Sequence, residues 1–278
     1  MYKLYFQIIE DLRVMGKIYH YTTIETLALI LKHKTIRFNR LDKVDDMEEA
    51  MYGSGNHRVL LGQYCFVSCW TKDNKENIAL WNMYTNNRGI RIAMDEDMFI
   101  KYKLSEKYYS YFKDYEHIEC DCNFIFPNNQ VKLHKIKYVE DNKSEISNLI
   151  NSNGEWININ TQDLGLIKNK LWRFQNECRF KLIALPRDSN LIKKIKNPNP
   201  VEISCSQIQS IFQNYKPCLE YIDIPINENA LNSIEVMLGP ETTLADKIIV
   251  ESLLREFTNS SIRNSYFIDK MRRKNNIL

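Results

Sequence analysis

Residues 17–25 read KIYHYTTIE, an apolar and aromatic run that leads into a helix start signal. Lys17–Tyr21 has the β-branched and aromatic composition of a strand. Thr22 and Glu25 have the spacing of a capping box, in which the threonine caps the helix and the glutamate hydrogen-bonds back to it. We therefore expect a strand that is followed directly by a helix.

A second apolar run, residues 63–70, reads QYCFVSCW, and only Gln63 and Ser68 interrupt it. This pattern predicts a buried strand. Further strands are expected where apolar and polar residues alternate, over 90–94, 134–139, 177–184, 221–226 and 233–237. We expect an α+β fold: a mixed, largely antiparallel sheet, split or curved around a cleft, with helices packed outside.

The helix after the second strand is expected to open at Asp73–Asn74 and to carry Trp81 and Tyr84, which on a helix are usually core residues. Gly89 is placed to end this helix in the left-handed conformation. Three more helices are expected, over 143–150, over 164–170 and from Thr242–Thr243 to about Phe257.

The length of the chain fits one large domain or two small ones, and the weak linker signals favour one. The chain has 278 residues, of which 44% are hydrophobic and 26% charged, so it can bury a sizeable core. The formal net charge of +3 does not by itself indicate a nucleic-acid binder. We expect an N-terminal helix over 1–16, a single domain over 17–257 with a variable insertion around 100–160, and a basic tail over 258–278.

Membrane insertion and secretion are not expected. No stretch of about 18 consecutive apolar residues occurs, and the N-terminal segment carries acidic residues and lacks the basic region and apolar run of a signal peptide. Seven cysteines at irregular spacings favour reduced thiols in the cytoplasm. Their spacings do not repeat as paired knuckles, so no metal site is expected.

Polar residues inside the strand-like runs are the candidates for chemistry, because the sequence holds no phosphate-binding loop, zinc-binding helix or nucleophile elbow. His20 and Ser68 each have an ordinary structural interpretation, as side chains hydrogen-bonded to the backbone. Glu177 and Arg179 lie on the same face of one strand, where they can form a structural pair. The acidic segment Asp45–Glu49 is typical of a solvated face.

Together, these motifs resemble a known bacterial family. The segments that carry the resemblance are Ile18–Thr23, Asp45–Glu48, Cys65–Trp70, Leu80–Tyr84 with Arg88–Gly89, Lys170–Arg179 and Ile234–Pro240. In order and spacing they are similar to the family catalogued as domain of unknown function 2971. The resemblance covers about residues 17–257, and the family label names no activity.

A more distant resemblance suggests a chemistry. A strand bearing Tyr-His-aromatic-Thr before a helix resembles the opening of ADP-ribosyltransferase-like proteins, including the DarT-type enzymes that modify DNA. The resemblance implies that His20 contacts the ribose of NAD, that Ser68 and Tyr84 shape the nicotinamide pocket, and that Glu177 completes the site. The other cofactor-binding positions that it implies are Tyr21, Thr22, Trp81 and Arg179.

The implied activity is that of an NAD-dependent ADP-ribosyltransferase-like enzyme or NAD glycohydrolase, acting as a toxin or phage-defence effector. Cleavage of the nicotinamide–ribose bond develops oxocarbenium character, so the Glu177 carboxylate would stabilise positive charge where it appears. His20 would orient the ribose rather than transfer a proton.

Two other functions stay open. A non-catalytic sensor or partner-binding subunit would use the aromatic segment 102–126 and the basic run Lys270–Lys274 as contact surfaces. A nucleic-acid-directed enzyme would contact phosphates through that run and through residues 193–196. Catalysis requires His20 and Glu177 to open onto one pocket with room for a dinucleotide. A binding module leaves them buried, or pairs Glu177 with its neighbouring arginine.

Overall fold

The computed structural model describes residues 16–50, 52–54, 57–59, 61–103, 109–110, 122–125, 131–152, 157–186, 217–258 and 260–271. The chain divides into two compact units made of interleaved segments. Unit 1 comprises Met1–Lys34, Thr71–Met98 and Ile226–Leu278, and unit 2 comprises Thr35–Trp70 and Phe99–Pro225. Apart from Gly16, the expected N-terminal helix lies outside the described residues, as do residues 193–196 and the tail beyond residue 271.

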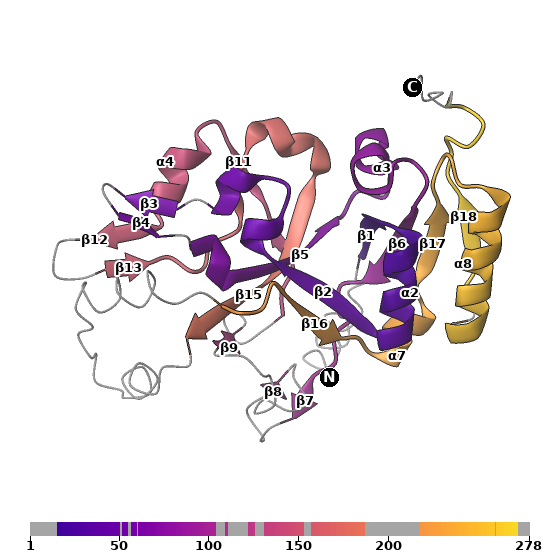
Figure 1. Ribbon diagram of the computed structural model, residues 1–278, viewed down its shortest axis with the longest axis horizontal. Helices are drawn as coiled ribbons and strands as arrows, with labels where there is room; N and C mark the ends of the chain where they lie inside the picture. The colour runs from indigo at the N-terminus through magenta and orange to yellow at the C-terminus, as the bar shows by residue number, and fades with distance from the viewer. Residues whose placement is uncertain are drawn as a thin grey trace, which may run out of the picture. The chain divides into compact units, whose positions relative to one another are not determined.

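The described strands of unit 1 form a sheet in the order β1-β6-β17-β18 (Figure 1). The bounds are β1 Lys17–Thr22, β6 Ile90–Asp95, β17 Glu235–Leu238 and β18 Ile262–Asn264. β6 runs antiparallel to β1 and to β17, whereas β17 and β18 are parallel. The expected strand at the start of the chain is therefore confirmed as β1.

Unit 1 also contains four helices among its described residues. They are α2 Ile24–His33, α3 Ile78–Thr85, α7 Glu228–Asn232 and α8 Leu244–Phe257. α2 is capped by Thr23, whose hydroxyl accepts from the backbone N–H of Thr26 at 3.2 Å. The expected cap was one residue too early, because Thr22 is still paired within β1. α8 ends at Phe257 as expected.

The end of α3 differs from the sequence prediction. The helix stops at Thr85, and the left-handed residues are Asn86 (φ 48°) and Asn87 (φ 62°) rather than Gly89. Asparagine tolerates this conformation because its short polar side chain bonds locally. Gly89 is required for another reason: a Cβ atom there would collide with the carbonyl oxygen of Thr22 and lie 2.8 Å from Cβ of Thr85.

The core of unit 1 includes a packed aromatic pair. Trp81 has no exposed surface, and its ring meets Tyr21 edge to face at a centroid distance of 4.8 Å. Leu80 completes this cluster, with Met237 and Phe267 packed against it. Edge-to-face aromatic contacts add stability beyond the burial of their surface.

The main sheet of unit 2 has the order β16-β2-β5-β15, and both β9 and β10 pair with β15 (Figure 1). The bounds are β2 Thr35–Arg40, β5 Cys65–Thr71, β9 Cys122–Ile125, β10 His134–Lys135, β15 Glu177–Pro186 and β16 Tyr221–Pro225. The pairs β16–β2, β2–β5, β10–β15 and β9–β15 are antiparallel. β5 is buried along almost its whole length, which confirms the expected buried strand.

Short elements make up the rest of the described part of unit 2. The two-stranded pairs are β3 Tyr52–Ser54 with β4 His57–Val59, β7 Tyr102–Lys103 with β8 Tyr109–Ser110, β12 Ile150–Ser152 with β13 Ile157–Ile159, and β11 Lys137–Val139 with β14 Ile167–Asn169. The helical pieces are η1 Leu41–Lys43, η2 Met47–Ala50, η3 Leu61–Tyr64, α4 Asn142–Ser147 and η5 Lys170–Gln175. For the aromatic segment 102–126, the structure describes only β7, β8 and β9, and the rest lies outside the described residues.

The helix predicted over 164–170 is wrong. Those residues form a turn, then β14, which pairs in parallel with β11, and the first residue of η5. Gly165 has φ +74°, and a right-handed helix cannot pass through a left-handed residue. A Cβ at Gly165 would also lie 2.9 Å from the Cys65 sulfur. The turn therefore requires glycine both for its backbone conformation and for the space beside Cys65.

The architecture is α+β, with a mostly antiparallel mixed sheet and several helices, as the sequence predicts at that level. An apolar core in unit 2 gathers residues from β5, α4, β14 and β15. Its buried members are Leu41, Leu61, Cys65, Val67, Ile146, Leu149, Leu164, Ile167 and Ile183. Among the described residues, no helix has both the length and the apolar character needed to cross a bilayer.

Replacing Gly89 by alanine tests the close approach in unit 1. We expect Gly89→Ala to lower the free energy of unfolding by about 2 kcal/mol, because the added methyl group forces the backbone apart. Gly16→Ala is the control, since the nearest atom to a Cβ there is a glutamate oxygen 3.8 Å away. Equal stability of the two variants in urea unfolding would contradict the packing seen at Gly89.

Candidate functional site

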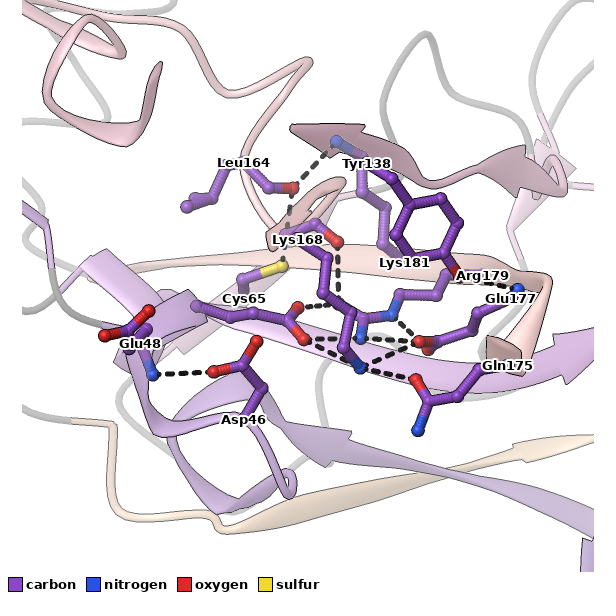
Figure 2. Close-up of polar contacts among 12 residues, drawn as sticks. Asp46, Glu48, Cys65, Tyr138, Leu164, Lys168, Gln175, Glu177, Arg179 and Lys181 are labelled. Atoms are coloured by element: carbon purple, nitrogen blue, oxygen red, sulfur yellow. Dashed lines mark hydrogen bonds and ion pairs between the residues drawn. The ribbon is translucent and has the colours of Figure 1, made fainter. Parts of the chain in front are cut away.

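Four charged side chains form a buried network in unit 2 (Figure 2). Glu49 comes from η2, Lys168 from β14, and Glu177 and Arg179 from β15. Their side chains are 0%, 3%, 7% and 1% exposed, respectively. Two carboxylates and two cations balance, so the network carries no net charge when all four are ionised.

Arg179 joins the two carboxylates. Its Nε donates to Oε1 of Glu177 at 2.5 Å, and Nη2 donates to Oε2 of Glu177 at 3.1 Å and to Oε1 of Glu49 at 3.0 Å. Nη1 donates to the second oxygen of Glu49 and to the carbonyl of Gly165 at 2.9 Å. These contacts use all five N–H donors of the guanidinium.

The ammonium group of Lys168 is also surrounded by acceptors (Figure 2). Its Nζ lies 3.0 Å from Oε1 of Glu49, 3.1 Å from Oε2 of Glu177 and 2.8 Å from the side-chain oxygen of Gln175. The same ammonium group lies 4.7 Å from the ring centroid of Trp172. An ammonium group has three donors, and each has an acceptor here.

The ion pairs keep Glu177 and Lys168 ionised. Burial raises the pKa of Glu177, but Arg179 and Lys168 outweigh it and bring that pKa to about 2. Burial lowers the pKa of Lys168, and the Glu177 and Glu49 carboxylates more than reverse this, so the net shift is upward. Glu177 is therefore an anion, and Lys168 a cation, throughout the physiological range.

Local sequence features position the network. Residues 177 and 179 point to one face of β15 because side chains alternate along a strand. Asn176, with φ 43°, turns the chain from η5 into β15. The backbone N–H of Glu177 donates to the Tyr138 hydroxyl at 2.9 Å. On the same strand, Lys181 donates to the carbonyl of Leu164 at 3.1 Å, which holds the turn that presents Gly165 to Arg179.

Asp46 adds a fifth ionisable group beside the network. It is 5% exposed, and its Oδ1 accepts from the backbone N–H of Glu48 at 3.0 Å, as Figure 2 shows. Its Oδ2 has no hydrogen-bond partner. Burial, followed by the nearby Glu49 carboxylate, raises the pKa of Asp46. An ionised Asp46 would leave the cluster with one unbalanced negative charge.

Five of the site residues implied by the resemblance belong to unit 1. Tyr21 and Trp81 are brought together, but as the core pair described above, and the Trp81 indole donates to Glu76 at 2.9 Å. Thr22 is buried in β1. His20 is partly exposed on β1, and Tyr84 is 37% exposed on α3.

The other three implied residues belong to unit 2. Ser68 is 5% exposed, and its hydroxyl accepts from the Trp70 indole at 3.0 Å. Glu177 and Arg179 are brought together as an ion pair within the buried network. His20 and Glu177, which catalysis would use jointly, are therefore contributed by different units.

Comparison of the chain with protein-family models, with curated proteins and with solved structures found no match. Metal binding has no evident site in the described part of the chain, where no three His, Cys, Asp or Glu side chains are grouped to hold an ion. The four described cysteine side chains, at 65, 69, 178 and 218, form no disulfide with one another.

The sequence interpretation missed three members of this cluster. Asp46 and Glu49 were expected on a solvated acidic face, but both are buried. Lys168 was expected in a helix. The available signal was a charged residue directly beside apolar strand residues: Lys168 follows Ile167, as Arg179 precedes Phe180. A charge within a buried run requires a partner, and that partner need not be near in sequence.

Glu177→Gln tests the network. We expect it to lower the free energy of unfolding by about 3 kcal/mol, because it leaves buried cations undercompensated. Glu140→Gln, the same change in the exposed pair with Lys170, is the control and should cost less than about 1 kcal/mol. The Glu177 contribution is present above its ordinary pKa of 4.5 and is lost as the pH falls toward about 2. Urea unfolding should therefore show this acid-dependent loss in wild type and not in Glu177→Gln.

Asp46→Asn is expected to stabilise the protein at neutral pH. A raised pKa means that the stability present while Asp46 is protonated is lost as the pH rises through that pKa. Asparagine keeps the acceptor for Glu48 and removes the charge, so we expect a gain of about 1 kcal/mol at pH 7 and a smaller gain at pH 4. Asp45→Asn, at the exposed neighbouring position, is the control. A loss of stability at pH 7 would show that Asp46 is favoured as an anion.

Proposed function

We propose that this protein acts by binding a partner through unit 2, and that Glu177 supports the structure rather than catalysing a reaction. One observation carries the proposal: both carboxylate oxygens of Glu177 are engaged by cations. Arg179 contacts them at 2.5 and 3.1 Å, and Lys168 contacts Oε2 at 3.1 Å. The side chain is 7% exposed.

The electrostatics argue against a catalytic carboxylate. Stabilising an oxocarbenium ion requires negative charge aimed at the reacting carbon. The charge of Glu177 is directed at Arg179 and Lys168, within a network whose net charge is zero. A pKa of about 2 also leaves Glu177 a poor general acid or base at neutral pH.

The second candidate is the NAD-dependent ADP-ribosyltransferase-like enzyme that the resemblance implies. It is favoured by a carboxylate that is held in place and ionised at neutral pH. It is also favoured by the partial exposure of His20 on β1. In this candidate the sheet splits around an NAD-binding cleft, the acceptor is a protein or a nucleic acid, and the chain is a cytoplasmic toxin or phage-defence protein of the family it resembles.

Nicotinamide release separates the two candidates. The full chain is incubated with NAD, with and without cell extract as acceptor, and nicotinamide is measured by mass spectrometry. We expect no release above a protein-free blank. His20→Ala is the informative variant, because Glu177→Gln is expected to destabilise the fold. His33→Ala, at an exposed position near the end of α2, is its matched control.

Release of nicotinamide by wild type and His33→Ala, but not by folded His20→Ala, would overturn the binding proposal and establish the enzyme. Circular dichroism at the assay temperature confirms that each variant is folded.

A further inference from the structure

The η5 turn, residues 169–176, exposes apolar side chains directly beside the buried network. Leu171 is 78% exposed and Phe174 is 41% exposed, whereas Gln175, one residue later, is 3% exposed. Large apolar side chains that are exposed together on one short turn are typical of a contact surface.

The turn is held rigidly at both ends. At its start, the Asn169 side chain accepts from the backbone N–H of Leu171 at 3.0 Å. At its end, the backbone N–H of Asn176 donates to the carbonyl of Arg173 at 3.1 Å. Gln175 is bound to Lys168, which is itself fixed by Glu49 and Glu177. A preorganised surface loses little conformational entropy on binding.

Two aromatic rings on the turn form a stack. The centroids of Trp172 and Phe174 are 6.2 Å apart, and their planes differ by 28°. Lys168 contacts the Trp172 ring from the network, with Nζ 4.7 Å from the centroid. Trp172 is thus supported by the protein, while Phe174 keeps 41% of its surface exposed. The exposed part of Phe174 is a flat apolar surface that another ring can contact.

The exposed charged side chains of the η5 turn are cations, Lys170 and Arg173. Lys168 is 3% exposed, and Glu49 and Glu177 neutralise it within the buried network. Arg173 lies between the two aromatic residues and is exposed. Lys170 is 52% exposed, and its pairing with Glu140 is a surface ion pair that a competing anion can replace. Cations therefore flank the aromatic stack on the chain.

We propose that the η5 turn binds single-stranded nucleic acid, with a base stacked on Phe174 and phosphates contacting Arg173 and Lys170. Aromatic side chains interleaved with cations are the usual means of binding single strands, because every base offers a flat face and every linkage a negative charge. An unpaired base is required, since the bases of a duplex are already stacked on one another. This inference rests on the proposed binding function and names its partner.

Binding to short single strands tests the proposal. The full chain is titrated into fluorescein-labelled 12-nucleotide oligo-dT and oligo-U, and anisotropy is recorded at several salt concentrations. We expect Phe174→Ala to weaken binding about 10-fold, within the range for losing one stacked base, and Phe174→Tyr to restore it. Arg173→Ala should reduce the salt dependence by about one phosphate contact. The two oligonucleotides distinguish a DNA partner from an RNA partner.

Tyr221→Ala is the matched control, because Tyr221 is an exposed aromatic residue of unit 2 outside the η5 turn, with Arg37 3.5 Å from its ring centroid. The proposal is overturned if wild type binds neither oligonucleotide at low salt, or if Tyr221→Ala weakens binding as much as Phe174→Ala. It is also overturned if a 12-bp duplex binds as tightly, or if an acidic peptide binds with the same dependence on Phe174, which would indicate a protein partner.

Failure of this inference and failure of the proposed function give different results. Absence of oligonucleotide binding together with absence of nicotinamide release removes nucleic acid as the partner and leaves a binding protein. Nicotinamide release that depends on His20 removes the binding proposal, whatever the oligonucleotides do.

Discussion

Arg179 lies between two carboxylates that are far apart in the chain. The hydrogen bonds that its buried guanidinium needs connect several segments of unit 2. A guanidinium that is 1% exposed must have every donor satisfied, because an unpaired buried charge costs several kcal/mol. Glu49, 130 residues earlier in the sequence, satisfies one side, and Glu177 the other. The carbonyl of Gly165 accepts the remaining donor. Meeting these conditions fixes η2, the turn before β14 and the start of β15 relative to one another.

The same interaction explains why η5 can be both apolar and exposed. Lys168 connects the network to the turn, since its Nζ contacts Glu49, Glu177, Gln175 and the Trp172 ring. The contacts of Lys168 with Gln175 and Trp172 therefore hold the turn in place, and its conformation does not depend on burying Leu171 or Phe174. In a loop without such support, exposed apolar residues would tend to collapse onto the surface. Here rigidity is supplied by ion pairs, which leaves the apolar side chains available for contact.

Periodicity predicted the elements that depend on local sequence. β1 follows from its β-branched and aromatic composition, β5 from a continuous apolar run and α8 from a helical apolar pattern, and each is observed. The failures have tertiary causes. The helix expected over 164–170 is replaced because Gly165 adopts φ +74° against Cys65, and β14 finds a partner in β11. The segment Asp45–Glu49 has the sequence pattern of a solvated face. Glu49 is nevertheless fully buried, because it forms ion pairs with Arg179 and Lys168.

The candidate site also depends on tertiary contacts that local sequence patterns do not predict. That Glu177 and Arg179 share a face follows from the two-residue repeat of a strand and could be predicted. Whether Glu177 remains available to a substrate could not, because that depends on Lys168 and on how Arg179 divides its donors between two carboxylates. Arg179 contacts both oxygens of Glu177, and Lys168 adds a second cation at Oε2. The pairing of Glu177 with Arg179 is thus local and predictable, whereas the contact with Lys168, nine residues earlier in the chain, depends on how β14 is placed against β15.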